Sequence, residues 1–145
     1  MVGLSYYDSW YNRGLELHRA IGMVLLGLAF LFGCWKLLSP SPMLQSELSP
    51  WEKLGAKTAH IILLLAMFAI PVTGYVISTS AGQGFSTFGL FEFPALLTTS
   101  ENTRDLATAA HYYLAYGLIV VVAVHAGAAL KHQFVDKHGT LMRMH

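Results

Sequence analysis

Three long apolar stretches, separated by shorter polar segments, dominate the hydropathy pattern of the chain. They cover residues 15–38, 57–78 and 105–131, and charged side chains occur only near their ends. Each stretch is close to the roughly 20 residues that an α-helix needs to cross a hydrocarbon layer about 30 Å thick. With 145 residues, the chain is predicted to form one domain, residues 1–145, folded as an all-α transmembrane helical bundle with three spanning helices.

The segment before the second stretch contains a signal for the start of a helix. The run Ser49-Pro50-Trp51-Glu52 offers an N-cap serine, a first-turn proline and a glutamate three residues after the cap. This combination is typical of a capping box. Further along the same stretch, Pro71 and Gly74 predict a kink, which a helical bundle tolerates.

Composition supports a membrane protein and excludes several other classes. Hydrophobic residues make up 54% of the chain and charged residues 12%, and the net charge is +1. Without a clustered basic patch, nucleic acid is not an expected partner. The single cysteine, Cys34, excludes an intrachain disulfide framework, a four-cysteine metal site and a C-x-x-C-H haem attachment. Any metal chemistry therefore depends on the seven histidines. No cleavable signal peptide is expected at the start of the sequence.

Lysine and arginine near the ends of the stretches predict the orientation of the chain. Six of them flank the loop at residues 39–56 and the C-terminus, and three flank the other side. The six are Lys36, Lys53, Lys57, Lys131, Lys137 and Arg143, and the three are Arg13, Arg19 and Arg104. Because cytoplasmic segments carry the excess of positive charge, the C-terminus is predicted to be cytoplasmic and the N-terminus to lie outside.

Two histidines in the third stretch share one helix face. His111 and His125 are 14 residues apart, which corresponds to nearly four helical turns and a rise of about 21 Å. Polar groups inside a membrane are costly, usually have a partner and often mark a functional site. We therefore interpret this pair as cofactor ligands, one near each edge of the membrane.

The first and third stretches run in the same direction, so their starts lie in the same leaflet. His18 and His111 are each one to two turns into their stretch, and are predicted to lie at similar depth. Two imidazoles without a nearby thiolate or carboxylate suit axial ligation of a haem iron. Zinc is the weaker alternative, because it needs a third and a fourth close ligand. For His18 alone, an interfacial residue that binds water or a carbonyl is an equally good interpretation.

More than one role is open for the other histidines and for the charged residues near the ends of the stretches. His60, near the predicted inner face, is interpreted as interfacial or as a hydrogen-bond partner behind a ligand, in preference to a ligand itself, and it could also contribute to a quinone site. Lys131 and His132 could flank a quinone head group, although solvent or lipid head groups are the default surroundings for His132, as for His138 and His145. Arg13 and Arg19 near the outer face could attract an anion, or pair with lipid head groups.

Five runs of sequence carry a resemblance to a known family. They are SYYDSWY, ELHRAIG, AHIILLLAMFAIPVTGY, FGLFEFPALL and AHYYLAYGLIVVVAVHAGAALKHQFVDKHGTLMRM. With these runs, from about Leu4 to Met144, the chain resembles the bacterial cytochrome b561 family. Members are four-helix proteins of the bacterial inner membrane that hold two b-type haems. The resemblance implies that His18 and His111 ligate the outer haem and that His125 supplies one ligand of the inner haem.

The chain departs from the family at the inner haem. In the family, the second inner ligand comes from a first helix that has no counterpart here, and truncation is the favoured explanation, with an altered variant as the alternative. Counted from Lys57 and Lys131, His60 and His125 would differ in depth by roughly one turn, so they are not expected to share an iron. We therefore expect one firmly held haem, at His18 and His111, with the His125 site empty or loosely filled.

The resemblance also implies a function. Studied members oxidise superoxide at the outer face and pass electrons to ubiquinone, and related cytochromes serve as membrane subunits of dehydrogenases or hydrogenases. The predicted function is electron transfer through haem b, from a small outer donor such as superoxide to the quinone pool. The alternative is an anchor or relay subunit for a redox partner protein. Whether the chain is itself an enzyme, a superoxide:ubiquinone oxidoreductase, stays open at this point.

Overall fold

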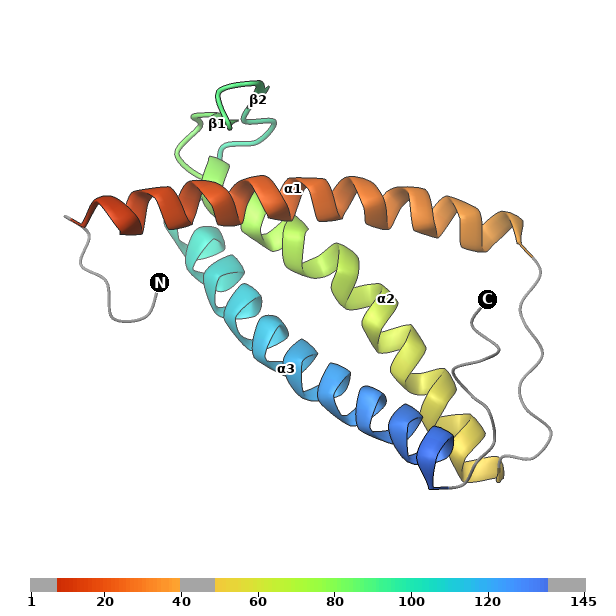
Figure 1. The fold of residues 1–145 in the computed structure, drawn as a ribbon. Coiled ribbons are helices and arrows are strands. Elements are labelled where there is room, and N and C mark those ends of the chain that lie inside the picture. Colours follow the sequence, from red (N-terminus) through yellow and green to blue (C-terminus); the bar gives the residue numbers. More distant parts are fainter. Residues whose placement is uncertain (1–7, 40–48, 136–145) are drawn as a thin grey trace.

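The computed structural model describes residues 8–39 and 49–135. This part of the chain forms three long helices, α1 (Ser9–Leu38), α2 (Pro50–Thr79) and α3 (Glu101–Phe134), as Figure 1 shows. All three are long and apolar enough to cross a membrane. The predicted all-α membrane bundle is confirmed.

Each helix begins at a side chain that caps its first turn. In α1 the Asp8 carboxylate accepts a hydrogen bond from the Trp10 backbone N–H. In α2, Ser49 and Glu52 form both arms of the predicted capping box. The helices begin four to seven residues before the predicted stretches, because a helix continues through polar residues until its backbone groups find a cap.

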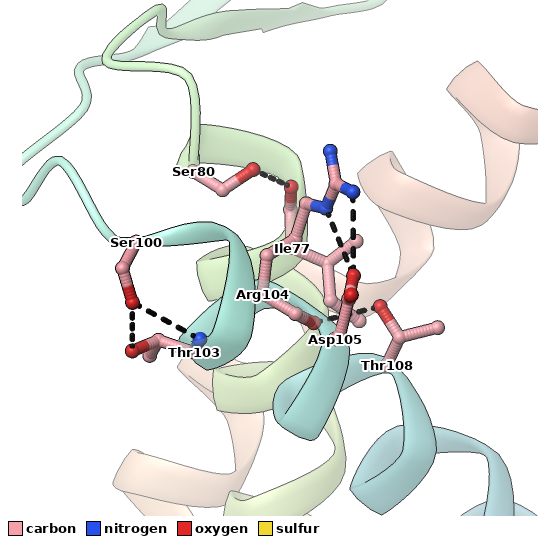
Figure 2. A network of polar contacts seen from close by, with 7 residues as sticks. All are labelled: Ile77, Ser80, Ser100, Thr103, Arg104, Asp105 and Thr108. Atoms are coloured by element: carbon pink, nitrogen blue, oxygen red, sulfur yellow. Dashed lines mark hydrogen bonds and ion pairs between the residues drawn. The ribbon is translucent and has the colours of Figure 1, made fainter.

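The start of α3 carries a small polar network, which Figure 2 shows. The Ser100 hydroxyl accepts from the Thr103 backbone N–H at 3.2 Å and caps the helix. The Arg104 guanidinium donates to the Asp105 carboxylate at 3.3 Å, and the Thr108 hydroxyl donates to the Arg104 carbonyl at 2.8 Å. Arg104 is thus an ion-paired residue at this end of the bundle.

Helix α2 packs against both α1 and α3, and α1 and α3 run in the same direction (Figure 1). The buried apolar residues of the described chain are all small: Ala20, Ala29 and Ala66. Most large apolar side chains face outward, which is the arrangement expected where lipid surrounds the helices. Toward the end of α1 and the start of α2, the two helices lie well apart (Figure 1).

A β-hairpin not predicted from the sequence joins α2 to α3. Strands β1 (Phe85–Thr87) and β2 (Phe91–Phe93) pair antiparallel, with Phe85 opposite Phe93. The turn uses positive φ at Phe88 (55°) and Gly89 (65°). Strands of three residues are too short for an alternating pattern to reveal them. The end of the bundle that carries this hairpin, where α1 and α3 begin and α2 ends, is called the hairpin end below.

The hairpin is attached to α2 through one tyrosine. The Tyr75 hydroxyl donates to the Pro94 carbonyl at 2.6 Å and accepts from the Leu96 backbone N–H at 3.1 Å. The Tyr75 ring also lies beside the Phe85 ring, with centroids 6.3 Å apart. These contacts hold β1 against the hairpin end of α2.

Candidate functional site

A cavity of about 510 Å³ lies at the hairpin end, between the three helices and β1. Its wall is mainly apolar, and its volume is in the range typical of ligand-binding sites. The residues of the wall that carry the argument below are His18 and Arg19 of α1, Gly74, Tyr75 and Ser78 of α2, Phe85 of β1, and His111 of α3. The cavity therefore draws on all three helices and on β1.

Two histidine rings face each other across this cavity. The centroids of His18 and His111 are 5.9 Å apart, and the ring planes are inclined by 79°. A metal–imidazole bond of about 2.0–2.1 Å would place two imidazoles on opposite sides of one ion with centroids roughly 6 Å apart. The predicted convergence of His18 and His111 is therefore present in the structure. Their role as iron ligands stays a prediction.

The hydrogen bonds of His111 fix which ring nitrogen is free. Its Nδ1 lies 2.9 Å from the Ile70 carbonyl oxygen and 3.1 Å from the Thr73 hydroxyl. A carbonyl oxygen only accepts, so the Nδ1–H donates to it and Nε2 keeps its lone pair. A metal-ligating histidine usually donates a hydrogen bond from its other ring nitrogen, as the His111 Nδ1–H does here. Such a bond orients the ring and raises the basicity of the ligating nitrogen. Helix α2 thus prepares His111 as a ligand.

Close approach of α2 to His111 depends on a glycine. A Cβ atom at Gly74 would lie 3.1 Å from His111 Cε1 and 3.5 Å from Nδ1. The sequence pattern indicated Gly74 only as part of a kink, and did not identify Thr73. Thr73 could have been identified from the sequence as a hydroxyl-bearing residue in an apolar span, because a hydroxyl group in a membrane helix needs a hydrogen-bond partner. Helix α2 continues through Pro71.

A second histidine pair lies at the opposite end of the bundle. The rings of His60 and His125 have centroids 5.0 Å apart and planes inclined by 67°. The expected difference in depth of about one turn between His60 and His125 is wrong, and whether the two share an iron stays a prediction. The expected difference assumed that Lys57 and Lys131 mark one plane, whereas both helices continue beyond these lysines. His60 is exposed and His125 half-buried.

Near this second pair, His132 joins the end of α3 to the start of α2. Its Nε2 lies 3.8 Å from the Glu52 carboxylate, and its side chain is 15% exposed. The solvated surroundings expected for His132 are therefore wrong, whereas Lys131 is exposed. A role for either residue toward a quinone stays a prediction. Lys137, His138, Arg143 and His145 lie outside the described residues.

The residues at the hairpin end suit a haem better than a bare metal ion. Within residues 8–39 and 49–135, no three His, Cys, Asp or Glu side chains converge as a cluster for a metal ion. The hairpin end offers instead two facing imidazoles, an apolar cavity and one buried donor, Arg19 Nε, that has no hydrogen-bond partner in the described chain. These features fit a haem that His18 and His111 would hold.

Comparison with known proteins decides the family. A family model described as prokaryotic cytochrome b561 matches residues 1–145. The chain belongs to the prokaryotic cytochrome b561 family. Proteins of this family are membrane electron-transfer proteins that bind b-type haem, so the resemblance read from the sequence is confirmed.

Three relatives illustrate the membership. Cytochrome b561 homolog 2 of Escherichia coli K12 is 42% identical over 144 residues, which cover 99% of this chain and 77% of the relative. Cytochrome b561 homolog 1 of the same organism is 28% identical, over 93% of this chain and 80% of the relative. A protein of Yersinia pestis named probable superoxide oxidase CybB is 30% identical, over 95% of this chain and 76% of the relative. A prokaryotic family and three spans fit a bacterial inner membrane.

Proposed function

We propose that this cytochrome b561 carries electrons through haem b from a small donor such as superoxide, at the outer face of the inner membrane, to the quinone pool. The observation that carries the proposal is the His18–His111 pair in the apolar cavity, with the His111 Nδ1–H held by the Ile70 carbonyl. The name of the Yersinia pestis relative supports superoxide as the donor. Ubiquinone is the proposed acceptor.

The residues at the hairpin end suit one-electron transfer. When bound, haem b supplies an iron that gains and loses a single electron. His18 and His111 would hold the haem iron through their imidazole nitrogens, which suits electron transfer. The bond from His111 to Ile70 and the apolar wall tune the potential at this site. Two superoxide ions give up one electron each, and one quinone takes two electrons and two protons.

The positive charges support an orientation with the hairpin end outside. Lys36, Lys53 and Lys57 lie toward the opposite end of α1 and α2, which the excess of positive charge assigns to the cytoplasm together with the C-terminus. Superoxide would then meet the cavity from outside, and a quinone would approach the end that carries Lys131 and His132.

The proposal is tested by purifying the protein, recording its optical spectrum and measuring quinone reduction after a pulse of superoxide. A low-spin haem b spectrum with quinone reduction by superoxide alone supports it. Reduction only in the presence of a partner protein would favour the anchor or relay subunit. A protein that takes up no haem would overturn the function.

One firmly held haem per chain is expected from the two histidine pairs. The rings of His60 and His125 are 5.0 Å apart, closer than the roughly 6 Å that two imidazoles on opposite sides of one iron require. A pyridine haemochrome assay against total protein should therefore give a ratio near one. Two low-spin haems that both dissociate slowly would contradict this prediction.

We expect His132→Ala to slow the oxidation of reduced haem by a short-chain quinone. The substitution removes an imidazole from the end of the bundle that a quinone would approach, and it also breaks the pair with Glu52. Stopped-flow oxidation of the haem absorbance measures the rate. Glu52→Gln is the control, because it weakens the same pair and keeps His132. Equal slowing in both variants would mean that His132 acts through helix packing, and an unchanged rate in His132→Ala would remove it from the quinone site.

A further inference from the structure

We propose that Arg19 pairs with a carboxylate of the bound haem, and that Phe85 of the hairpin holds the guanidinium in place. The proposal rests on the proposed function, because it needs haem in the cavity. It adds a positioning residue that neither histidine pair includes. It also gives the hairpin a part in cofactor binding.

Arg19 is an arginine with an unsatisfied donor at a membrane-embedded site. It follows His18 directly, lines the same cavity, and its Nε is buried without a hydrogen-bond partner in the described chain. A buried donor left unpaired destabilises the folded chain, and a charged donor does so more strongly. Charged residues inside spans usually face a cavity and have a partner. Among the described residues, Arg19 is thus a cationic side chain with a buried donor that lacks a partner.

The other two arginines at the hairpin end have different surroundings. Arg104 is ion-paired with Asp105. Arg13 is exposed and lies over the Trp10 ring at 5.9 Å. Arg19 alone among these three lines the cavity with His18. The missing partner is therefore expected from the cavity, and not from solvent.

Haem chemistry supplies a suitable partner. The porphyrin of haem b carries two propionate side chains, and a carboxylate binds a guanidinium through two parallel N–H···O bonds that can include Nε. Two hydroxyl groups of the wall are already engaged. The Ser78 hydroxyl donates to the Gly74 carbonyl at 2.8 Å, and the Tyr75 hydroxyl binds Pro94 and Leu96. Arg19 is the lysine or arginine that lines this cavity, so its guanidinium is the group that would neutralise a carboxylate in it.

Phe85 restrains the guanidinium from the hairpin side. The Arg19 Cζ lies 5.7 Å from the centroid of the Phe85 ring, a distance within the range of cation–π attraction. Phe85 in turn stacks on Phe93 with centroids 5.5 Å apart, and lies beside Tyr75. Because Tyr75 ties the hairpin to α2, the hairpin orients Arg19 relative to the cavity.

The test separates the carboxylates of haem from the rest of the porphyrin. The full chain is produced without haem, placed in lipid nanodiscs and titrated with haem or with the dimethyl ester of the same iron porphyrin. Arg19→Gln should weaken haem binding roughly tenfold, as expected for the loss of a charged hydrogen bond. The ester should bind the unaltered chain and Arg19→Gln equally well. The readout is the dissociation constant from the absorption titration.

Arg13→Gln is the matched control, since it removes the same charge from the same helix and should change neither titration. Phe85→Leu should weaken haem binding less than Arg19→Gln, and should add nothing when Arg19 is already glutamine. Equal weakening for haem and ester would overturn the proposal and assign Arg19 to packing. No weakening of either would overturn it in favour of an anion from solution or a lipid phosphate. If the unaltered chain binds neither porphyrin, the proposed function fails first, and this proposal fails with it.

Discussion

Replacing His111 with alanine is expected to abolish the low-spin haem spectrum and most of the haem content. His111 faces His18 at 5.9 Å and is the ring whose free nitrogen is fixed by a hydrogen bond to Ile70. Loss of a partner behind a metal ligand alone costs about 10–100-fold in affinity, so loss of the ligand itself should cost more than about 100-fold. Pyridine haemochrome content and the reduced absorption spectrum measure the effect. His18→Ala should behave in the same way.

His125→Ala is the matched control, because it removes an imidazole from the same helix at the other end of the bundle. It should keep the low-spin haem held by His18 and His111. Full haem content with an unchanged reduced spectrum in His111→Ala would remove the hairpin-end pair from the site. Loss of the low-spin signal in His125→Ala alone would move the firmly held haem to the other pair.

The parts of the fold that follow from local rules were predictable from the sequence. Hydropathy locates the three spans, because the length of an apolar helix in a membrane is set by the thickness of the hydrocarbon layer. The capping box at Ser49 and Glu52 depends only on residues three positions apart. The approach of His18 to His111 follows from two helices that run in the same direction, with each histidine near its start.

The parts that depend on helix rotation and tilt were not predictable. The bonds from His111 to Ile70 and Thr73 span about 40 positions of sequence, and they require one particular rotation of α2 against α3. The contact of His60 with His125 does not follow from the sequence, because lysines near the span ends are poor markers of depth where helices extend past them. Likewise, the pair of His132 with Glu52 joins helix ends whose relative height only packing determines.

The hairpin shows a related limit for the site itself. Its strands contribute six residues, too few for a periodic signal, and yet one of them, Phe85, lies against Arg19. From sequence, Arg19 was a residue near the outer face with two equal interpretations. The buried Nε without a partner among the described residues favours a partner within the cavity, and the titrations with haem and its ester test that choice.

Substituting Gly74 by alanine tests whether α2 positions His111 by close contact. The added methyl group would lie 3.1 Å from His111 Cε1, so the ring must move by a few tenths of an ångström or α2 must shift. Overpacking of this kind typically costs about 1–3 kcal/mol. Movement of the ring would also lengthen the bond from Nδ1 to the Ile70 carbonyl. We expect haem affinity to fall by about tenfold, as for other losses behind a metal ligand.

Gly117→Ala is the matched control, because a Cβ at that position of α3 meets no atom within 4 Å. Alanine in place of a mid-helix glycine favours the helix by about 0.5–1 kcal/mol, so this variant should bind haem normally and unfold at the same or a higher temperature. Haem titration and thermal unfolding of the haem-free chain separate the two effects. If Gly74→Ala lowers haem affinity and leaves haem-free stability unchanged, the strain falls on His111 as a ligand. If Gly74→Ala binds haem as tightly as Gly117→Ala does, α2 does not position His111 through this contact.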